Sequence, residues 1–292
     1  MKKTIFTFIL IIIFFYVNAQ DSDYPYPSLS PNGTISQTVG NTVITIDYER
    51  PSVRKRQIFG HLVPWNKVWR TGAGKCTRIS FDKSVIVGGQ KIEAGSYSLF
   101  TIPNQKEWTI ILNSDTSLYG SYDYDAKKDV ARFIVIPNES DRFYEALNFD
   151  IEILPNDAKI FFSWANIQFS FDVKTTTDSE IEELIETDLL TKKSKDSRIY
   201  AGASEYLLFQ DRNFSDALKL AGFAIELDKN NGWARSLRIK IYEKLKLYDE
   251  ALAEVDIFIK HIQSRKYDNE KEKENIMREL RSDHVRISNL MK

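Results

Sequence analysis

Hydrophobic and polar side chains alternate with a period of two through the first half of the chain. From Thr34 to Tyr48 the alternation runs through two segments separated by Gly40-Asn41, a pair typical of a hairpin turn. Similar short segments follow, and prolines or polar loops end several of them. We expect strands at 34–39, 42–48, 77–81, 85–87, 90–92, 97–102, 108–112, 130–136, 146–154, 159–164 and 167–173.

The pattern changes near Thr177, where hydrophobic side chains begin to recur every three or four residues. Thr177-Asp178-Ser179-Glu180 has the form of a capping box at the start of a helix. Four apolar residues then share one helical face: Ile181, Leu184, Ile185 and Leu189. The chain therefore predicts an α+β protein in two domains, an antiparallel β-sandwich or barrel over 32–174 and an all-α helical-repeat domain over 175–292.

The helical part contains an internal repeat of 34 residues. The run Phe214-Ser-Asp-Ala217-Leu218 recurs as Tyr248-Asp-Glu-Ala251-Leu252. A helix–turn–helix unit of this length resembles the tetratricopeptide family, in which a small alanine lets two helices approach closely. The usual proline after the second helix is replaced by Lys229. We interpret 198–262 as two such repeats capped by a final helix, and we expect their concave face to bind a protein partner.

The first residues have the form of an export signal. Lys2 and Lys3 precede an apolar run from Ile5 to Val17, and the Val-Asn-Ala ending at Ala19 fits a signal-peptidase site. The run is shorter than the ~20 residues of a spanning helix, so an uncleaved membrane anchor is the less favoured alternative. We predict a signal peptide over 1–19 cleaved after Ala19, a linker over 20–31, and a periplasmic or secreted protein without a membrane span.

Composition argues against several classes of function. The chain has 40 basic and 41 acidic residues, so it lacks the basic excess typical of nucleic-acid-binding proteins. Cys76 is the only cysteine, so no internal disulfide can form and both domains depend on burial. The sequence contains no glycine-rich phosphate loop, zinc-ligand spacing or dinucleotide fingerprint, and we predict no cofactor.

The segment 63–75, V-P-W-N-K-V-W-R-T-G-A-G-K, is the strongest candidate for a binding site. Trp65 and Trp69 can stack on a sugar or an aromatic ligand, although large aromatic side chains more often fill a core. The planar guanidinium groups of Arg50 and Arg70 can hold a carboxylate or phosphate, or can pair with an internal carboxylate. We include Thr71, which follows Arg70, in this ligand-binding hypothesis.

The loop 119–129 is a second candidate. Its tyrosines can face a ligand groove, and Asp123, Asp125 and Asp129 carry oxygen atoms of the kind that calcium prefers. Their spacing lacks the glycine and terminal glutamate of a full calcium loop, so we favour a solvated hairpin tip and predict no metal. Tyr122 and Asp123 remain in the ligand-binding hypothesis.

Several blocks of the β-domain resemble one known family. The blocks are Arg50-Pro51-Ser52-Val53, Arg56, Ile58-Phe59-Gly60, Leu62-Val63-Pro64, Val68-Trp69-Arg70-Thr71-Gly72-Ala73, 94–103, Trp108, Asn113, Gly120, Tyr122 and Asp129-Val130. In this order, over about 28–173, they are similar to an exported bacterial family known only as domain of unknown function twenty-nine eleven. The resemblance implies an exported β-rich domain, sometimes followed by helical repeats, and brings no known activity. Gly74-Lys75 replaces the family's Asn-Glu, so any role of that glutamate is lost here.

No complete catalytic set emerges from the residues. His61 is the one histidine of the β-domain, so a Ser–His–Asp arrangement would need it. A carboxylate pair drawn from Glu107, Asp123 and Asp125 is the other hydrolytic possibility. We therefore predict a non-catalytic exported protein whose β-domain binds a small molecule, a glycan or an envelope partner. The alternative hypothesis is a hydrolase that uses His61 or a carboxylate pair. A third hypothesis is a purely structural protein, in which the helical repeats only brace the β-domain.

Overall fold

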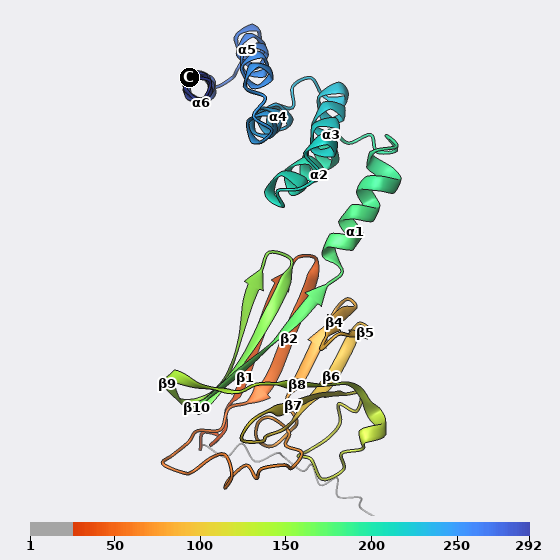
Figure 1. Cartoon of the computed structure of the whole chain (residues 1–292), viewed down its shortest axis with the longest axis vertical. Coiled ribbons are helices and arrows are strands. Elements are labelled where there is room, and N and C mark those ends of the chain that lie inside the picture. Colours follow the sequence, from red (N-terminus) through yellow and green to blue (C-terminus); the bar gives the residue numbers. More distant parts are fainter. Residues whose placement is uncertain (1–25) are drawn as a thin grey trace, which may run out of the picture.

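The protein divides into a β-rich region and a helical region, as the change in periodicity predicts (Figure 1). This computed structural model describes residues 26–292, so the predicted signal peptide lies outside the described residues. The strands are β1 (Asn32–Val39), β2 (Thr42–Glu49), β3 (Arg78–Phe81), β4 (Val85–Val87), β5 (Gln90–Ile92), β6 (Gly95–Ile102), β7 (Trp108–Asn113), β8 (Asp129–Val135), β9 (Asn138–Leu154) and β10 (Asp157–Thr175). The helices are α1 (Thr177–Leu184), which continues as a π-helical turn η2 (Ile185–Leu189), α2 (Ser197–Phe209), α3 (Phe214–Leu227), α4 (Gly232–Lys244), α5 (Tyr248–Ser264) and α6 (Glu270–Leu290).

Two antiparallel sheets make up the β-rich region. One sheet has the strand order β1-β2-β3-β6-β7-β8, and the other has the order β5-β4-β10-β9. Both sheets are open at their edges, whereas a barrel closes every strand onto a neighbour. The expectation of two facing antiparallel sheets is confirmed, and the barrel alternative is wrong.

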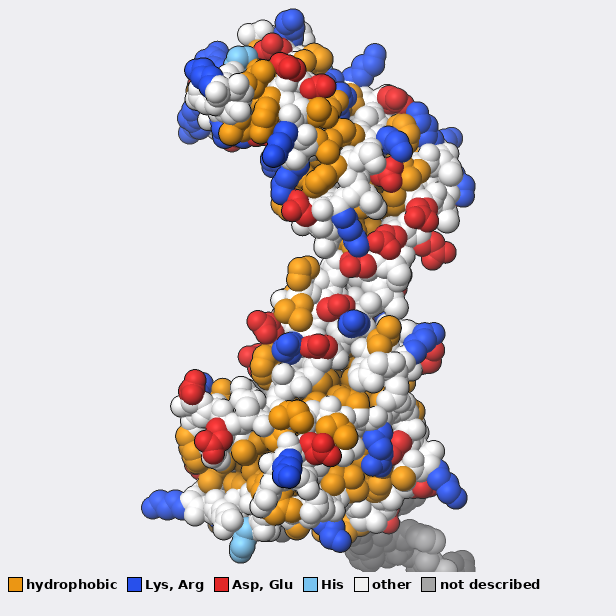
Figure 2. All heavy atoms as spheres, viewed as in Figure 1, with side chains coloured by type: hydrophobic (Ala, Val, Ile, Leu, Met, Phe, Trp, Pro, Cys, Tyr) orange, Lys and Arg blue, Asp and Glu red, His pale blue; other side chains and the backbone are white. Residues whose placement is uncertain are grey.

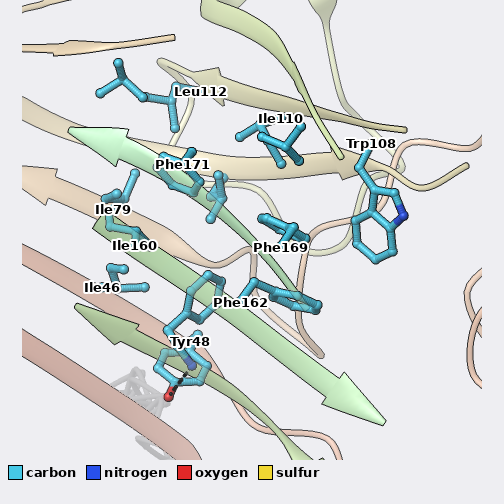
Figure 3. Close-up of a cluster of buried hydrophobic side chains, with 14 of the residues drawn as sticks. Ile46, Tyr48, Ile79, Trp108, Ile110, Leu112, Ile160, Phe162, Phe169 and Phe171 are labelled. Atoms are coloured by element: carbon cyan, nitrogen blue, oxygen red, sulfur yellow. Dashed lines mark hydrogen bonds between the residues drawn. The ribbon is translucent and has the colours of Figure 1, made fainter. Parts of the chain in front are cut away.

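The two sheets share one hydrophobic core (Figure 3). Every second side chain of β2, from Ile44 through Ile46 to Tyr48, is buried, as a strand with one face on a core requires. The rings of Trp108, Phe162 and Phe169 contact one another, with centroids 4.7–5.7 Å apart. Burial of these large rings holds the region together without a disulfide.

Strand β10 is one continuous element where the sequence predicts two strands. The predicted segments 159–164 and 167–173 join across Ala165, which has a φ of +53°. The register with β9 shifts on both sides of Ala165, so this residue forms a β-bulge. The bulge bends the strand and interrupts the side-chain alternation, which is why the sequence pattern there resembles a break.

A long loop, residues 50–77, connects β2 to β3 and folds across one end of the two sheets (Figure 1). Trp69 and Thr101 of β6 exchange two backbone hydrogen bonds of 2.8 and 2.9 Å. Val53 donates its backbone N–H to the carbonyl of Glu145 in β9 at 2.7 Å. Five apolar side chains of the loop are buried in the common core: Val53, Ile58, Phe59, Val63 and Trp69. The loop is therefore anchored to both sheets.

Helix α1 begins directly after β10 and is fastened to the turn between β1 and β2. The backbone N–H of Asn41 donates to Thr177 Oγ1 at 2.9 Å. Gly40 approaches so closely that a Cβ there would overlap the same oxygen. The predicted capping box is wrong, because Thr176 occupies the N-cap position and the hydroxyl of Thr177 serves this contact with the sheet.

Each helix from α2 to α5 packs against the next one along the chain. Helices α2 to α6 lie above a narrow waist at α1 (Figure 2). Helix α2 packs on α3, α4 on α5, and α5 on α6, while α3 and α5 begin 34 residues apart. Ala217 and Ala251, the small residues of the sequence repeat, are fully buried. Within residues 26–292, no helix is both long enough and apolar enough to cross a membrane.

Candidate functional site

A cavity of about 310 Å³ opens where the 50–77 loop meets the N-terminal lead and β10. It is lined by Leu29, Ser30, Pro51, Arg54, Arg56, Leu62, Val63, Trp69, Arg70, Gly72, Ala73 and Trp164. We name it the arginine pocket. Three of the lining side chains are arginines and none is an aspartate or a glutamate, so the lining carries net positive charge.

Trp69 forms one wall of the arginine pocket and also belongs to the core. Its side chain is buried and stacks on Trp164, with ring centroids 5.8 Å apart and an interplanar angle of 17°. Its indole Nε1–H donates to the carbonyl of Gly72 at 3.1 Å. Trp69 therefore gives the pocket its shape but has no free donor to offer.

Thr71 holds the backbone on the other side of Arg70. It is fully buried and has a φ of +55°, a conformation that β-branched residues rarely adopt. Its hydroxyl lies 3.3 Å from the carbonyl oxygen of Trp69 and 3.2 Å from Thr101 Oγ1, and Thr77 Oγ1 donates to the Thr71 carbonyl at 2.8 Å. Thr71 does not line the pocket, and its bonds maintain the strained turn that presents Arg70.

Arg70 sits between these two anchored residues and is half-buried. Its Nε atom is shielded from solvent and has no hydrogen-bond partner among residues 26–292. A buried donor without an acceptor costs about 1–3 kcal/mol, and more when it is charged. Arg70, a lining residue of the pocket, thus carries a cationic donor without an acceptor in the described residues.

Trp164 supplies a second donor of the same kind. It lies on β10 immediately before the bulge at Ala165 and is 1% exposed. Its indole Nε1 also lacks a partner in the described part of the chain, whereas the indole of Trp69 stacked on it is satisfied. Buried tryptophan N–H groups usually find an acceptor. Two residues from distant segments, each with a buried donor that lacks a partner, therefore line one cavity.

Arg54 and Arg56 complete the positive lining, but backbone contacts occupy them. Arg54 Nη2 donates to the Leu29 carbonyl and Arg56 Nη2 to the Ser52 carbonyl, both at 2.6 Å. The carboxylate of Glu145 accepts from the backbone N–H of Arg54 at 2.8 Å and does not line the pocket. These two guanidiniums contribute positive potential while holding the loop in place.

Two other residues of the ligand-binding hypothesis lie outside the arginine pocket. Arg50 Nε donates to the Leu147 carbonyl at 3.0 Å and Nη2 to Asn148 Oδ1 at 3.2 Å, so Arg50 ties the end of β2 to β9. Trp65 is partly buried and stacks on Phe59, with ring centroids 6.1 Å apart. Both side chains therefore make contacts within the protein, Arg50 through hydrogen bonds and Trp65 through stacking.

The loop 119–129 passes near Arg70 without entering the pocket. Tyr122 and Asp123 are exposed, and neither lines the cavity. A Cβ on Gly120 would lie 2.8 Å from the Tyr122 ring and 3.5 Å from Arg70 Nη1, so this loop borders the guanidinium. Among residues 26–292 no group of three potential metal ligands comes together.

Cys76 lies close to Arg70 but is not an activated thiol. Its Sγ–H donates to the Gly120 carbonyl at 2.8 Å. Burial raises the pKa of the Cys76 thiol to about 11, and the lowering of that pKa by the charge of Arg70 is a smaller effect. A thiol with so high a pKa is a poor nucleophile near neutral pH.

The residues of the hydrolase alternative do not meet in this pocket. His61 is exposed on the loop and is absent from the lining, as are Glu107, Asp123 and Asp125. Ser30 is the one lining residue with a hydroxyl, and no histidine stands beside it in the lining. The cavity therefore offers donors and positive charge but no general base.

Residues 30–173 match the family DUF2911, described as a protein of unknown function. The match supports assignment of the β-rich region to the family that the sequence blocks resemble. The matched span contains every lining residue of the arginine pocket except Leu29. No curated protein and no solved structure matches the chain.

Proposed function

We propose that the β-rich region, which matches a family without an assigned activity, is a non-catalytic module that binds a small ligand in the arginine pocket. One observation carries the proposal: Arg70 and Trp164 line the same cavity, and each has a buried donor, Nε and Nε1, without a partner in residues 26–292. Its volume lies at the lower end of the usual range for small-molecule sites. A ligand that accepts from both donors would relieve the cost of burying them.

The segments of the chain from which the lining residues come support this assignment. Most of the lining residues belong to the sequence blocks that resemble DUF2911: Pro51, Arg56, Leu62, Val63, Trp69, Arg70, Gly72 and Ala73. They come from a loop anchored to both sheets by backbone hydrogen bonds. Binding residues are often carried on loops that a rigid scaffold positions. A hydrolase receives no comparable support, because the lining contains no base.

The test is a thermal-shift screen of a small-molecule library with wild type and Leu62→Trp. Leu62 is 43% exposed and lines the pocket, so tryptophan there would cover the opening whatever the ligand's charge. The matched control is Ile86→Trp, because Ile86 is 41% exposed and lines a different groove. Compounds that stabilise wild type and Ile86→Trp but not Leu62→Trp would support the proposal. A screen in which Leu62→Trp responds as wild type does would overturn it.

We propose that the helical region is a tetratricopeptide-like scaffold for a protein partner. The 34-residue spacing of α3 and α5 supports this, as does a groove lined by α2, α4 and α6. Phe209 and Leu290 line that groove and are 74% and 52% exposed, which a purely bracing role would not require. The test is crosslinking in envelope extracts, where a specific adduct should disappear in Phe209→Asp and persist in a Phe143→Asp control.

Export remains part of the proposal because it rests on the sequence of the first residues. The lysine pair, the apolar run and Ala19 support a cleaved signal peptide. Protein purified from the periplasm or the culture medium should begin at Gln20. Mature protein that still begins at Met1 would contradict this part.

A further inference from the structure

We propose that the ligand of the arginine pocket is a carboxylate attached to an apolar body, with Arg70 Nε and Trp164 Nε1 donating to its two oxygens. This inference rests on the proposed binding function and specifies the chemical class of the ligand. It follows from the number of free donors, the charge of the lining and the apolar walls.

The charge of the lining selects an anion. Arg54, Arg56 and Arg70 bring three positive groups to the cavity, and no lining residue is acidic. In the described part of the chain, Glu145 is bonded to the backbone N–H of Arg54, not to a guanidinium of the pocket. A ligand anion would supply the missing counter-charge in a place where water is partly excluded.

The free donors match a carboxylate better than a phosphate. Arg54 and Arg56 already donate to backbone carbonyls, and the buried donors of the lining residues that lack partners are Arg70 Nε and Trp164 Nε1. A carboxylate has two oxygens, one for each donor. A phosphate would bring at least three oxygens and up to two charges, so its third oxygen would depend on the Nη groups of Arg70 or on water and not on a buried donor.

The remaining walls fit an apolar body. Pro51, Leu62, Val63 and Trp69 line the cavity, and Ala73 adds a small apolar side chain. These groups cannot hydrogen-bond a sugar ring, so only the arginines and Ser30 would offer side-chain partners to its hydroxyls. Burial of a hydrocarbon or aromatic group against them would stabilise the complex in proportion to its area.

The experiment compares three probes that share a benzyl group: phenylacetate, its neutral amide phenylacetamide, and benzylphosphonate. Affinities are measured by titration calorimetry with wild type, Arg70→Gln, Trp164→Phe and a Lys106→Gln control, which removes an exposed cation outside the pocket. We expect wild type and the control to bind phenylacetate more tightly than either analogue. Arg70→Gln and Trp164→Phe should each weaken phenylacetate about tenfold or more, because each removes a hydrogen bond to a charged group.

A second readout reports on the donor itself and does not depend on the folding of a variant. The chain has five tryptophans, so their indole N–H signals can be followed individually by nuclear magnetic resonance in wild type. Phenylacetate should shift the Trp164 signal downfield, and the amide should shift it less.

The outcomes separate this inference from the proposed function. Tighter binding of benzylphosphonate, equal binding of the amide, or an unmoved Trp164 signal would overturn the carboxylate assignment. Absence of phenylacetate binding at millimolar concentration would overturn it as well. If the library screen still yields compounds whose binding Leu62→Trp abolishes, the proposed function stands without this ligand class.

Discussion

The β-rich and helical regions each contain an arginine whose Nε is buried without a partner in the described part of the chain, but the two regions differ in how the charge is met. Arg235 of α4 is 8% exposed, and its Nη1 pairs at 3.1 Å with Glu254 of α5, which is itself 2% exposed. Glu254 also pairs with Arg238 at 3.0 Å. Arg70 has a buried Nε but no carboxylate partner among the described residues. The charge of Arg235 is therefore neutralised within the fold, whereas the charge of Arg70 has no counter-ion within residues 26–292 and is available to a ligand.

Arg50 lies between these two cases. It is satisfied by a backbone carbonyl and an amide oxygen, without a carboxylate. Its hydrogen bonds join β2 to β9, so its role is structural although it carries the same guanidinium as Arg70. The partners of an arginine therefore distinguish scaffolding from recognition better than its place in a motif does.

The largest effect should come from removing the internal counter-ion. Glu254→Ala leaves Arg235 buried without its carboxylate, and we expect the free energy of unfolding of the helical region to fall by about 3–5 kcal/mol. Urea unfolding followed by far-ultraviolet circular dichroism measures this change. Glu279→Ala, an exposed glutamate of α6, is the control and should change it by less than about 0.5 kcal/mol. A fall in the free energy of unfolding of less than about 1 kcal/mol in Glu254→Ala would show that Arg235 does not depend on this carboxylate, and the contrast with Arg70 would fail.

Arg50→Met should have an intermediate effect. It removes two hydrogen bonds of a charged group and leaves the Leu147 carbonyl without this donor, so we expect a loss of about 1–3 kcal/mol in the β-rich region. Tryptophan fluorescence during urea unfolding, measured in a Trp233→Phe background, reports on this region, which contains the other four tryptophans. The control is Arg78→Met, which breaks an exposed ion pair with Asp47 and should cost less than about 1 kcal/mol. Equal losses in the two variants would show that Arg50 is not a structural clamp.

Cys76 gives a smaller, pH-dependent effect beside Arg70. Its pKa in the folded protein is raised from 9.0 to about 11, so burial favours the neutral thiol. The stabilisation is fully present below pH 9 and is lost as the pH rises from 9 towards 11. We expect iodoacetamide at pH 9 to label native protein more slowly than urea-unfolded protein, and Arg70→Met to slow native labelling further. Native labelling at the unfolded rate would contradict the raised pKa.

Arg70→Met should have the smallest effect on stability. Arg70 has no ion pair in the described residues, and removal of its unpartnered Nε relieves a cost that offsets the packing lost with the side chain, so the free energy of unfolding should fall by less than about 0.5 kcal/mol without ligand. The same denaturation measurement as for Arg50→Met checks this. A loss of about 2 kcal/mol would place Arg70 among the structural arginines and would erase the contrast with Arg235.

Part of the candidate site could be predicted from local sequence. The close spacing of Trp69, Arg70 and the neighbouring glycines predicted a site in the loop that lines the pocket. The run Arg54-Lys55-Arg56 carried a signal for positive charge, but nothing local indicated which arginines were already bonded. Trp164 was missed because it lies in a strand pattern that predicts only core packing.

The sequence by itself determined the two kinds of secondary structure and where one succeeds the other. Alternation with a period of two and recurrence every three to four residues are properties of neighbouring side chains, so they can be read without a fold. The tertiary structure alone decided which groups meet. Trp164 stacks on Trp69 across 95 residues of chain because of the register of β10 and a bulge at Ala165, and Glu254 reaches Arg235 because α5 packs on α4. Such contacts depend on how the elements are placed in space, and no local pattern encodes that placement.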